Sequence, residues 1–562
     1  MQNHKILKIP SADIPFQKKL NKELGISQIL AQILINRGIS SLKEAEEFLN
    51  SKLSHLLDPY SFSEMPKAVD LIKQAIKNKE KVLVYGDYDV DGITAVTLLK
   101  ETLTKTGLDV LHYLPHRIQD GYGLTRNILD IAKREHIHLL ITADCGISNH
   151  KEVEALRKHN IEVIITDHHE PQGNKLPPAS SIINPKVKES GYKFRELAGV
   201  GVAYKLCQAI SGTNLLDELD LVALGTIADV VPLIGENRII AKEGLAKLPN
   251  TMRHGLKALI RNANIKNKKF TATHVSFIFA PRINASGRMD SAETSLKLLM
   301  SKNDSEAEGF ASVIEAHNRE RQKIESKIME EAEDLINREI NFKDHKVIVL
   351  AKEDWHQGVL GIVAAKLADR FMRPTIIISL GDKLCKGSGR SIQNFHLFHA
   401  LKECQEFLSA FGGHAHAVGL VIDKEKIKDF KDTINRFAHE KLKIEDLLPS
   451  LDVDMEVSFS DLSEKTIIEL ESLEPFGTGN PEPLFYTRNL KLKGVPQVLG
   501  RETLKFWVSD GEITFQTIAF GMSSFKESLM QAKSFDLVYS PRMDSWNDFD
   551  SVILEVRDMF FR

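Results

Sequence analysis

Short runs of β-branched and apolar residues alternate with helix-forming stretches between residues 81 and 166. Alternation of this kind predicts a parallel sheet with helices on both faces. The strand-like runs cover residues 82–85, 139–142 and 163–166, and the helical stretches cover 94–104, 125–135 and 151–159. Each run leads into an acidic residue, which is Asp87, Asp144 or Asp167. Ligands of open α/β sheets bind beyond the carboxyl ends of the strands, so the three acids are expected at one site.

The length and composition predict a multidomain protein without a membrane segment. A chain of 562 residues predicts two to four domains. Its net charge of −3 neither indicates nor excludes a nucleic-acid partner. The apolar runs are too short for a bilayer, and the N-terminus has too few apolar residues for a signal peptide. The four cysteines lack metal-finger spacing. We therefore expect a cytoplasmic protein with free thiols and no membrane contact.

Changes in residue pattern along the chain divide it into five regions. Residues 304–340 are charged, almost free of helix breakers and apolar at helical spacing, which predicts one long connecting helix. After residue 450, short strands separated by turns suit a small barrel. The predicted regions are an N-terminal helical region (1–78), a parallel-sheet α/β domain (79–300), a connecting helix (301–342), a smaller α/β domain (343–448) and a β-barrel (449–562).

Three aspartates, Asp87, Asp89 and Asp91, alternate across the loop after the first predicted strand. Carboxylates repel one another, and a divalent metal is the usual counter-charge, often for phosphate chemistry. A solvated acidic turn is the simpler alternative. An EF-hand is disfavoured, because loop position twelve, counted from Asp87 or Asp89, holds Leu98 or Lys100 instead of Glu.

Further acids and imidazoles occur in the same context. Asp144 follows the second strand, and Asp167, His168 and His169 follow the third. Neutral imidazole is a common metal ligand, although a hydrogen-bonded buried histidine beside an exposed one is an equal alternative. Asp144 has the alternative of capping the next helix. Asp229 lies in a mostly apolar run, where a buried acid needs a partner or a metal. The joint occurrence favours a metal site.

These motifs resemble a known superfamily. The ordered motifs Asp89-Val90-Asp91, Asp144, Asp167-His168-His169 and Asp229 resemble those of the DHH phosphoesterases. Pyrophosphatases and nano-RNases of that superfamily place a histidine four residues before the Asp-x-Asp pair. Tyr85 stands there in this chain and Asp87 is added, as in the RecJ-type exonucleases. Segments similar to the RecJ-type branch cover residues 197–203, 280–288, 355–361, 387–391, 411–417 and 475–481, so the resemblance spans nearly the whole chain.

The resemblance implies an α/β fold class: a parallel-sheet DHH domain and a smaller α/β DHH-associated domain joined by a long helix, plus a C-terminal OB-like β-barrel. The helical N-terminus and the DHH domain are expected to form one lobe. The implied cofactors are two divalent metal ions, Mn²⁺ or Mg²⁺. The implied ligands are Asp89, Asp91, Asp144, His168 and Asp229.

Other residues are expected to serve the reaction or the substrate. By resemblance, Asp87 is a ligand or holds a metal-bound water, Asp167 orients a histidine, and His169 binds the scissile phosphate or protonates the leaving group. The expected phosphate-binding residues are Arg282, Arg288, Ser388, Arg390 and His414, although a surface ion pair is the simpler reading of a lone arginine. The barrel aromatics Phe506, Trp507, Phe515 and Trp546 stack on bases or fill the barrel core.

The resemblance implies a single-strand-specific DNA exonuclease that degrades 5′→3′ and releases 5′-mononucleotides in recombination and repair. Its expected partners are single-stranded DNA with a 5′ end and a single-stranded-DNA-binding protein, and the enzyme is expected to be monomeric. Two alternatives remain. One is a DHH phosphoesterase for oligoribonucleotides or cyclic dinucleotides, which the extra barrel and Tyr85 disfavour. The other is a non-catalytic DNA-binding scaffold, which the retained acids disfavour.

Overall fold

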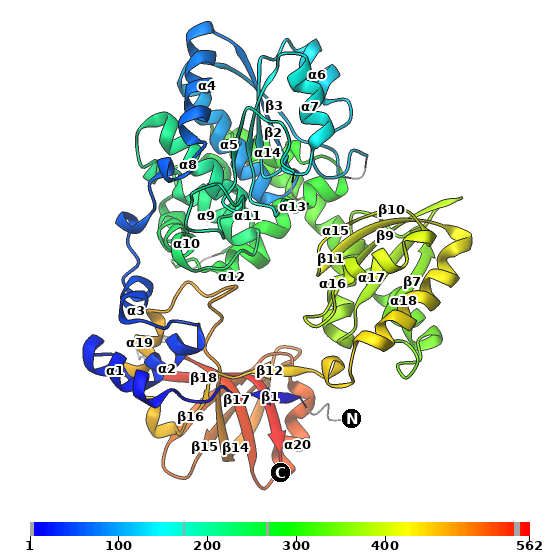
Figure 1. The fold of residues 1–562 in the computed structure, drawn as a ribbon. Helices are drawn as coiled ribbons and strands as arrows, with labels where there is room; N and C mark the ends of the chain where they lie inside the picture. The colour runs from blue at the N-terminus through cyan, green and yellow to red at the C-terminus, as the bar shows by residue number, and fades with distance from the viewer. Residues whose placement is uncertain (1–4, 118, 172, 174, 266–268, 545–550) are drawn as a thin grey trace.

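The computed structural model describes residues 5–117, 119–171, 173, 175–265, 269–544 and 551–562 (Figure 1). Two α/β units and a β-barrel follow one another along the chain. In Figure 1 the first α/β unit lies at the top, the second on the right and the barrel at the bottom. The fold class expected from the sequence is confirmed.

The first unit contains five parallel strands in the order β3-β2-β4-β5-β6. The chain passes from β2 to β3 on one side and then returns to the other side of β2 as β4. Such a reversal opens a crevice between the carboxyl ends of β2 and β4. The strands are β2 (Lys81–Gly86), β3 (Asp109–Tyr113), β4 (Leu139–Ala143), β5 (Glu162–Thr166) and β6 (Ser181–Ile183).

Helices cover both faces of this sheet because alternate strand residues point to opposite sides. Val82 and Val84 share one core with helices α4 (Met65–Asn78), α5 (Val90–Lys105) and α8 (Gly199–Ser211). Leu83 and Tyr85 share the other with α6 (Ile128–Arg134) and α7 (His150–Lys158). Further helices extend the first core: α9 (Leu219–Ala228), α10 (Gly235–Lys247), α11 (His254–Asn262), α12 (Ala272–His274), α13 (Ala280–Met289) and α14 (Glu293–Leu299).

A single helix, α15 (Asp304–Glu339), connects the two α/β units. Its side-chain cap is Asn303, which accepts a hydrogen bond from the Glu306 amide. Its 36 residues span about 54 Å. The N-terminal half packs into the first core through Ala311 and Ile314, and the C-terminal half packs against the second unit through Ile328 and Ile336. The predicted connecting helix therefore lies where the sequence pattern indicates.

The second unit has a mixed five-stranded sheet in the order β10-β11-β9-β8-β7. Helices α15 and α16 (Leu360–Phe371) cover one face, and α17 (Leu397–Glu403) and α18 (Ile427–Lys441) cover the other. Because β9 ends and β11 begins close to the first unit's crevice, this sheet brings a second set of loops to the site. The strands are β7 (Ile348–Glu353), β8 (Thr375–Leu380), β9 (Leu384–Arg390), β10 (Leu408–Gly413) and β11 (Ala417–Asp423).

The C-terminal strands form a barrel in the order β13-β14-β15-β16-β18-β17, which closes through a pairing of β14 with β17. Its interior is filled by large side chains such as Phe485, Phe506, Phe535 and Tyr539. Helices α19 (Glu464–Glu471) and α20 (Lys526–Gln531) accompany it. The strands are β13 (Met455–Glu456), β14 (Phe485–Leu499), β15 (Thr503–Ser509), β16 (Thr514–Ala519), β17 (Phe535–Asp544) and β18 (Ser551–Phe561).

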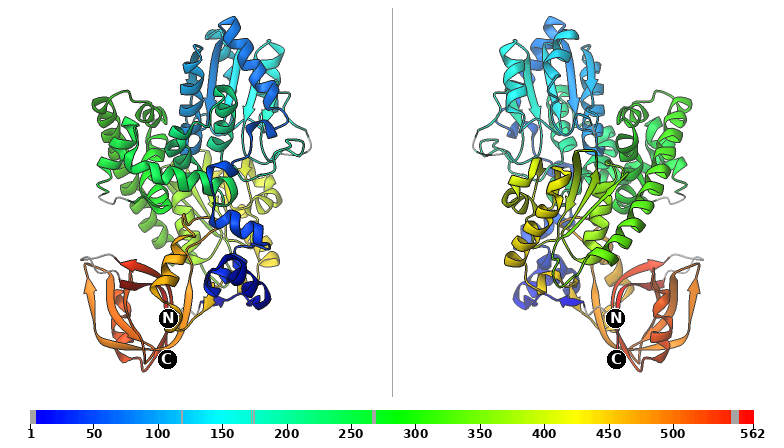
Figure 2. Two further views of the ribbon diagram at one scale, coloured as in Figure 1. Left: turned by 90° about the vertical axis from the view of Figure 1, so that its left-hand side faces the viewer. Right: turned by 90° about the vertical axis from the view of Figure 1, so that its right-hand side faces the viewer.

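The N-terminal helices differ from the expectation that residues 1–78 join the DHH lobe. Helices α1 (Ile14–Leu24), α2 (Gln28–Asn36) and α3 (Leu42–Leu49) share their core with the barrel, and only α4 packs on the parallel sheet (Figure 2). Helix α2 is apolar on most sides and needs a large apolar partner, which the barrel supplies. The strand β1 (Ile6–Lys8) also pairs with β12 (Ser450–Asp452).

Two further observations bear on the environment of the protein. No helix in the described part of the chain is long and apolar enough to cross a membrane. All four cysteines are buried free thiols.

Candidate active site

The loop after β2 places three carboxylates over the start of α5. Asp89 caps that helix, and its Oδ1 accepts a hydrogen bond from the Gly92 amide at 3.1 Å. Asp91 accepts hydrogen bonds from the amides of Gly199 (2.6 Å) and Val200 (2.7 Å), at the N-terminus of α8. A helix N-terminus favours negative charge, so α8 holds Asp91 in place at the crevice.

Two glycines allow the acids to come close to their neighbours. A Cβ atom at Gly92 would lie 2.5 Å from the carbonyl oxygen of Asp87. A Cβ atom at Gly199 would lie 2.6 Å from both Cβ and Oδ1 of Asp144. Asp144 itself has a left-handed backbone, with φ of 62°, which turns its side chain toward α8. The local sequence therefore serves the approach of Asp87 and Asp144 to the other ligand candidates.

His168 lies at the centre of the acids. Its Nε2 atom is 3.2 Å from Asp144 Oδ1, 3.5 Å from Asp229 Oδ2 and 3.9 Å from Asp91 Oδ2. Asp229 reaches the site from the C-terminal end of α9. The structure therefore gathers the five ligands expected from the sequence, together with Asp87, at the switch point of the sheet.

In the part of the chain that the structure describes, the potential ligand atoms form three overlapping groups, in each of which all atoms lie within 4.8 Å of one another. Asp144 joins Asp87 and Asp89 in one group and joins the two histidines in another. His168 also joins Asp91 and Asp229 in the third. Because Asp144 and His168 each belong to two of these groups, the groups form one continuous cluster of potential ligands. Two-metal phosphoesterase sites have this character.

The electrostatics of the cluster call for cations. Burial, followed by repulsion from a neighbouring aspartate, raises the pKa values of Asp87, Asp144 and Asp229 well above the usual range. The same causes raise the pKa of Asp91 to about 7, with Asp89 as the repelling neighbour. A bound cation would reverse this repulsion and keep the carboxylates ionised.

Potential ligand atoms without hydrogen bonds also indicate that the cluster binds cations. Burial, followed by the charge of His169, lowers the pKa of His168 to about 3, so its imidazole is neutral and able to bind metal. Among the described residues, Asp87 Oδ1, Asp144 Oδ1 and both ring nitrogens of His168 are buried without a hydrogen-bond partner. Such atoms are costly unless a ligand completes them. Carboxylate oxygens with one imidazole suit Mn²⁺ or Mg²⁺.

Asp167 is saturated by hydrogen bonds and orients His169. Its Oδ1 accepts from the amides of both histidines and lies 2.7 Å from His169 Nδ1, and its Oδ2 accepts from the Ile147 amide. The hydroxyl of Tyr122 lies 3.0 Å from the same Nδ1 atom. Burial opposes the charge of His169, but its contact with Asp167 prevails and raises the pKa of His169. Asp167 therefore has the supporting position expected for it.

Arginines gather beside the acids. Burial, followed by the charges of Arg117, Arg390 and Arg321, lowers the pKa of Arg288. The Arg117 guanidinium lies 4.5 Å from the centre of the Tyr88 ring, and in the described part of the chain its buried Nη1 has no hydrogen-bond partner. Like charges this close indicate an anionic ligand. Arg117 and Tyr122 were not predicted, because each is a single polar residue in an irregular loop.

The second unit contributes the other predicted phosphate contacts. Arg390 is the last residue of β9, and its Nη1 donates to Ser388 Oγ at 3.3 Å and to the Gly389 carbonyl at 2.8 Å. The His414 ring stacks on His169, with 6.4 Å between ring centres. Arg282, by contrast, pairs with Glu315 on α15 (2.8 Å) and donates to the Ile278 carbonyl. The structure therefore brings Ser388, Arg390 and His414 to the site but engages Arg282 in an internal ion pair.

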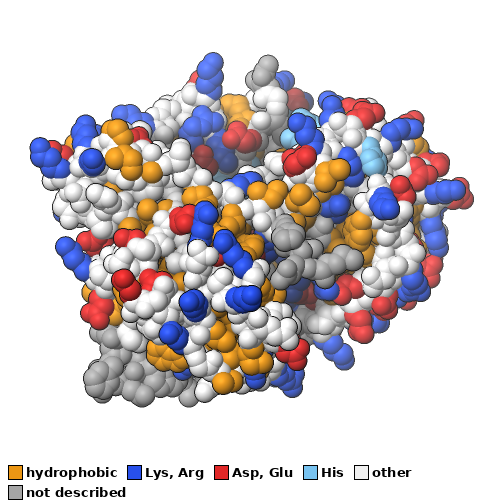
Figure 3. Space-filling view, turned by 90° about the horizontal axis from the view of Figure 1, so that it is seen from below, with side chains coloured by type: hydrophobic (Ala, Val, Ile, Leu, Met, Phe, Trp, Pro, Cys, Tyr) orange, Lys and Arg blue, Asp and Glu red, His pale blue; other side chains and the backbone are white. Residues whose placement is uncertain are grey.

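The barrel presents one aromatic side chain among cations. Phe506 is buried in the barrel and Phe515 packs against that core, whereas the adjacent Trp507 is 48% exposed. Trp507 pairs with Lys493 on β14, and Lys505 pairs with Gln497 on the same face. Figure 3 shows Lys and Arg side chains lying among hydrophobic ones on the lower side of the molecule. Trp546 lies outside the described residues.

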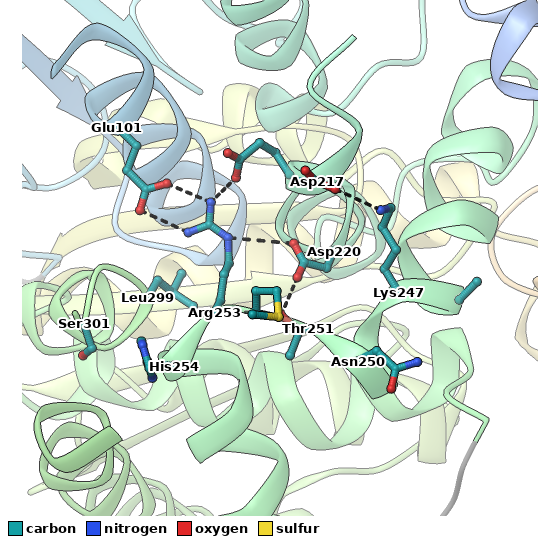
Figure 4. Close-up of a pocket in the computed structure, with 13 residues that line it drawn as sticks. Glu101, Asp217, Asp220, Lys247, Asn250, Thr251, Arg253, His254, Leu299 and Ser301 are labelled. Carbon is teal, nitrogen blue, oxygen red and sulfur yellow. Dashed lines mark hydrogen bonds and ion pairs between the residues drawn. The ribbon is translucent and has the colours of Figure 1, made fainter. Parts of the chain in front are cut away.

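A separate hollow beside α9, α11 and α14 is lined by an ion-pair network (Figure 4). Arg253 donates to Glu101 at 3.1 and 2.8 Å and also pairs with Glu218. Asp220 accepts a hydrogen bond from Thr251. These charges satisfy one another, and none of the sequence-predicted site residues lines this hollow.

The parallel sheet and its acid-imidazole cluster define a metal-dependent phosphoesterase of the DHH class. Three family models match the chain: the DHH family N-terminal domain at residues 81–226, the DHHA1 domain at 344–440 and the RecJ OB domain at 453–558.

Curated relatives and solved structures agree. The single-stranded-DNA-specific exonuclease RecJ of Bacillus subtilis is 38% identical over 96% of this chain and 69% of the relative. RecJ of Escherichia coli is 35% identical over 84% of each chain. The crystal structure of Thermus thermophilus RecJ with Mn²⁺ matches with a TM-score of 0.85 and 27% identity, over 100% of this chain and 80% of that one. A second Thermus structure contains Mg²⁺. The chain belongs to the RecJ family of single-stranded-DNA-specific exonucleases.

Proposed function

We propose that this chain degrades single-stranded DNA from its 5′ end and releases 5′-mononucleotides during recombination and repair. One observation carries the proposal: buried, unsatisfied ligand atoms of Asp87, Asp144 and His168 lie beside clustered arginines. Such a site holds cations on one side and a polyanion on the other. Family membership supports the choice of DNA as that polyanion.

The proposed ligands of two Mn²⁺ or Mg²⁺ ions are Asp89, Asp91, Asp144, His168 and Asp229. Asp144 and His168 each belong to two of the ligand groups found among the described residues, so these two side chains would link the ligands of the site. Asp87 completes the shell or holds a metal-bound water. When bound, the ions polarise the phosphodiester and lower the pKa of the attacking water.

His169 is proposed to hold the proton that the leaving 3′-oxygen takes up when the P–O3′ bond breaks. Asp167 supports this role because it binds Nδ1 at 2.7 Å and raises the pKa of His169. Tyr122 restrains the same ring from a second direction. The phosphate remains on the 5′-carbon of the next nucleotide, which becomes the new 5′ end.

The proposed phosphate contacts are Arg117, Arg288, Ser388, Arg390 and His414. Guanidinium groups bind phosphate through paired hydrogen bonds. Nη1 of Arg117, which no described residue engages in a hydrogen bond, supports this use. His414 lies over His169 from the opposite unit, which favours one strand over a duplex. Arg282 is proposed only as a support of this region, because Glu315 engages it.

The barrel is proposed to hold the part of the strand that has not yet reached the site. Trp507 offers a stacking surface, and Lys493 and Lys505 offer counter-charge on the same face. We further propose a monomer in the cytoplasm that a single-stranded-DNA-binding protein recruits. The buried free thiols support a reducing compartment.

The proposal is tested with matched single-stranded DNA, duplex DNA and RNA labelled at either end. We expect mononucleotides to be released first from the 5′ label of single-stranded DNA in Mn²⁺. Asp144→Asn should abolish release, whereas Asp220→Asn, at a buried aspartate outside the site, should retain it. Initial release of the 3′ label, or equal cleavage of duplex, would contradict the proposal. Preference for dinucleotides or cyclic dinucleotides would favour the small-substrate alternative.

A further inference from the structure

The segment directly after Asp229 has a strained backbone that other parts of the molecule must hold. Asp229 ends α9, and the next residue, Val230, has a φ of +63°. A β-branched residue in the left-handed region is a genuine outlier, and such strain persists only where the surroundings impose it. The Val230 side chain is 63% exposed, so its own packing does not impose this conformation.

Two hydrogen bonds hold the segment from opposite sides. The Leu233 amide donates to the carbonyl oxygen of Thr478 at 2.7 Å. The side-chain amide of the fully buried Asn237 donates to the Pro232 carbonyl at 3.1 Å and also to the Glu196 carbonyl. Glu196 lies in the segment that leads into α8, whose first amides hold Asp91. Asn237 therefore links the segment after Asp229 to the segment before α8, the helix that holds Asp91.

Thr478 belongs to a turn, residues 475–481, that precedes β14 of the barrel. The turn is held by Asn480, which is fully buried and donates to the carbonyls of Leu473 (2.7 Å) and Pro475 (3.0 Å). A Cβ atom at Gly477 would lie 2.7 Å from Leu233 Cδ1. The turn therefore packs directly on the segment that follows Asp229.

A glycine and an arginine show how closely the turn is docked. Gly479 has a φ of +75°, and a Cβ there would lie 3.1 Å from Pro232 Cβ. Arg238 of α10 donates to the carbonyls of Leu473 (2.7 Å), Ser472 (2.9 Å) and Phe48 (3.1 Å). Arg238 thus ties the DHH unit to both the pre-turn segment and α3.

We propose that the 475–481 turn positions Asp229, so that docking of the barrel on the DHH unit and metal binding at the active site stabilise each other. The inference rests on the proposed role of Asp229 as a metal ligand. In this arrangement Thr478, Leu233 and Asn237 are positioning residues. Coupling of this kind is reciprocal: a weakened dock lowers metal affinity, and bound metal strengthens the dock.

The test compares two glycines with similar backbones in the full-length chain. Gly479→Ala adds a methyl group against Pro232 at a φ of +75°. Gly521→Ala adds one at a φ of +69° in a barrel turn where no atom of the described residues lies within 4 Å of the new Cβ. The two variants carry similar backbone strain but differ in contact with the segment after Asp229. Calorimetric titration of the EDTA-treated proteins with Mn²⁺ measures the effect.

We expect Gly479→Ala to weaken Mn²⁺ binding about 3- to 10-fold, the range of a modest coupling energy, and Gly521→Ala to change it less than twofold. Equal affinities in the two variants would overturn the inference. A separate outcome bears on the proposed function. If Asp229→Asn leaves the Mn²⁺ affinity of the otherwise native chain unchanged, Asp229 is not a ligand. The proposed ligand set is then wrong, whatever the result for the two glycine variants.

A measurement on the native chain avoids any loss of folding in the variants. Hydrogen exchange is recorded with and without Mn²⁺, with activity playing no part in the readout. We expect Mn²⁺ to slow exchange at residues 230–234 and also at residues 475–481. Protection confined to the acidic loops and residues 230–234 would overturn the coupling, because it would show that the turn does not respond to the metal.

Discussion

His168 Nε2 lies 3.2 Å from Asp144 Oδ1, yet within the described residues neither atom has a hydrogen-bond partner. Burying two polar atoms without a hydrogen bond costs free energy, and nothing in this pair offsets that cost. A cation between them and their neighbours removes this cost. Stability should therefore depend on metal.

Mn²⁺ should raise the unfolding free energy of the native chain. At a free concentration 100-fold above Kd, one bound ion adds about 2.7 kcal/mol. Thermal unfolding of the EDTA-treated protein, with and without added Mn²⁺, measures the difference. Asp144→Asn is the matched variant, because it should lose most of this gain. Identical unfolding temperatures with and without Mn²⁺ would contradict the metal site.

Asp167→Asn should lower kcat about 10- to 100-fold, the usual effect of removing a residue that orients a ligand or catalytic group. The reason is that Asn cannot offer His169 Nδ1 the same charge and acceptor. KM for a single-stranded oligonucleotide should change little. Asp130→Asn, at an exposed aspartate of α6, is the control. A raised KM with unchanged kcat would instead assign Asp167 to substrate binding.

Arg117→Ala should raise KM for 5′-phosphorylated single strands by about 10-fold or more, with a smaller effect on kcat. Hydrogen bonds to charged groups contribute about 1.5–3 kcal/mol, and Arg117 Nη1 has no hydrogen-bond partner among the described residues. Steady-state kinetics on oligonucleotides of one length provide the measurement. Arg134→Ala, whose side chain is 71% exposed, serves as the control. Equal KM values for the two variants would remove Arg117 from the phosphate site.

The site was predictable where it follows from sheet geometry. Asp87, Asp144 and Asp167 each follow a parallel strand, and parallel strands bring their carboxyl ends to one edge. Arg117 and Tyr122 have no such rule. They lie in irregular loops, and their positions depend on packing that no periodic pattern records. The guanidinium group of Arg282 is able to bind phosphate. Its partner Glu315 lies on another helix, however, and the sequence does not indicate that the two residues pair.

The barrel shows a different limit of prediction from the sequence. Phe506 and Trp507 are neighbours, so one must face inward and the other outward in a strand. With aromatic residues at both positions, the sequence does not indicate which faces the core. The packing of α2 on the barrel could not be predicted from the sequence either, because only the tertiary structure brings residues such as Leu34 and Phe459 into one core.

Trp507→Ala should weaken binding of single strands long enough to reach the barrel by about 5- to 100-fold, since stacking contributes about 1–3 kcal/mol per base. Short oligonucleotides that fill only the active site should bind as before. Fluorescence anisotropy across a length series measures this in a metal-free buffer. Ile468→Ala, at an exposed residue of α19, is the control, and Trp507→Phe should retain most of the affinity. A length-independent loss would contradict the assignment.

Leu34→Ala should destabilise the shared core of α2 and the barrel by about 2–5 kcal/mol. Leu34 is fully buried there, so the change leaves a cavity. Chemical unfolding is followed by Trp507 fluorescence in a background that carries Trp355→Phe and Trp546→Phe, so that the signal reports on the barrel. Ile14→Ala, at an exposed position of α1, should change stability by less than about 0.5 kcal/mol. An unchanged barrel transition in Leu34→Ala would show that the N-terminal helices fold independently.

The shared core also sets an order of events during synthesis. Helices α1–α3 leave the ribosome before the barrel, and the strands that cover them follow about 400 residues later. At translation rates of roughly 5–20 residues per second, that interval is about 20–80 s. Throughout it, the apolar side of α2, including Ile29, Leu30 and Ile33, lacks the barrel side chains that complete its core. We expect helices α1–α3 of the nascent protein to need a chaperone that shields their apolar side chains. This need should last until the barrel is made, well after the metal-binding sheet has folded.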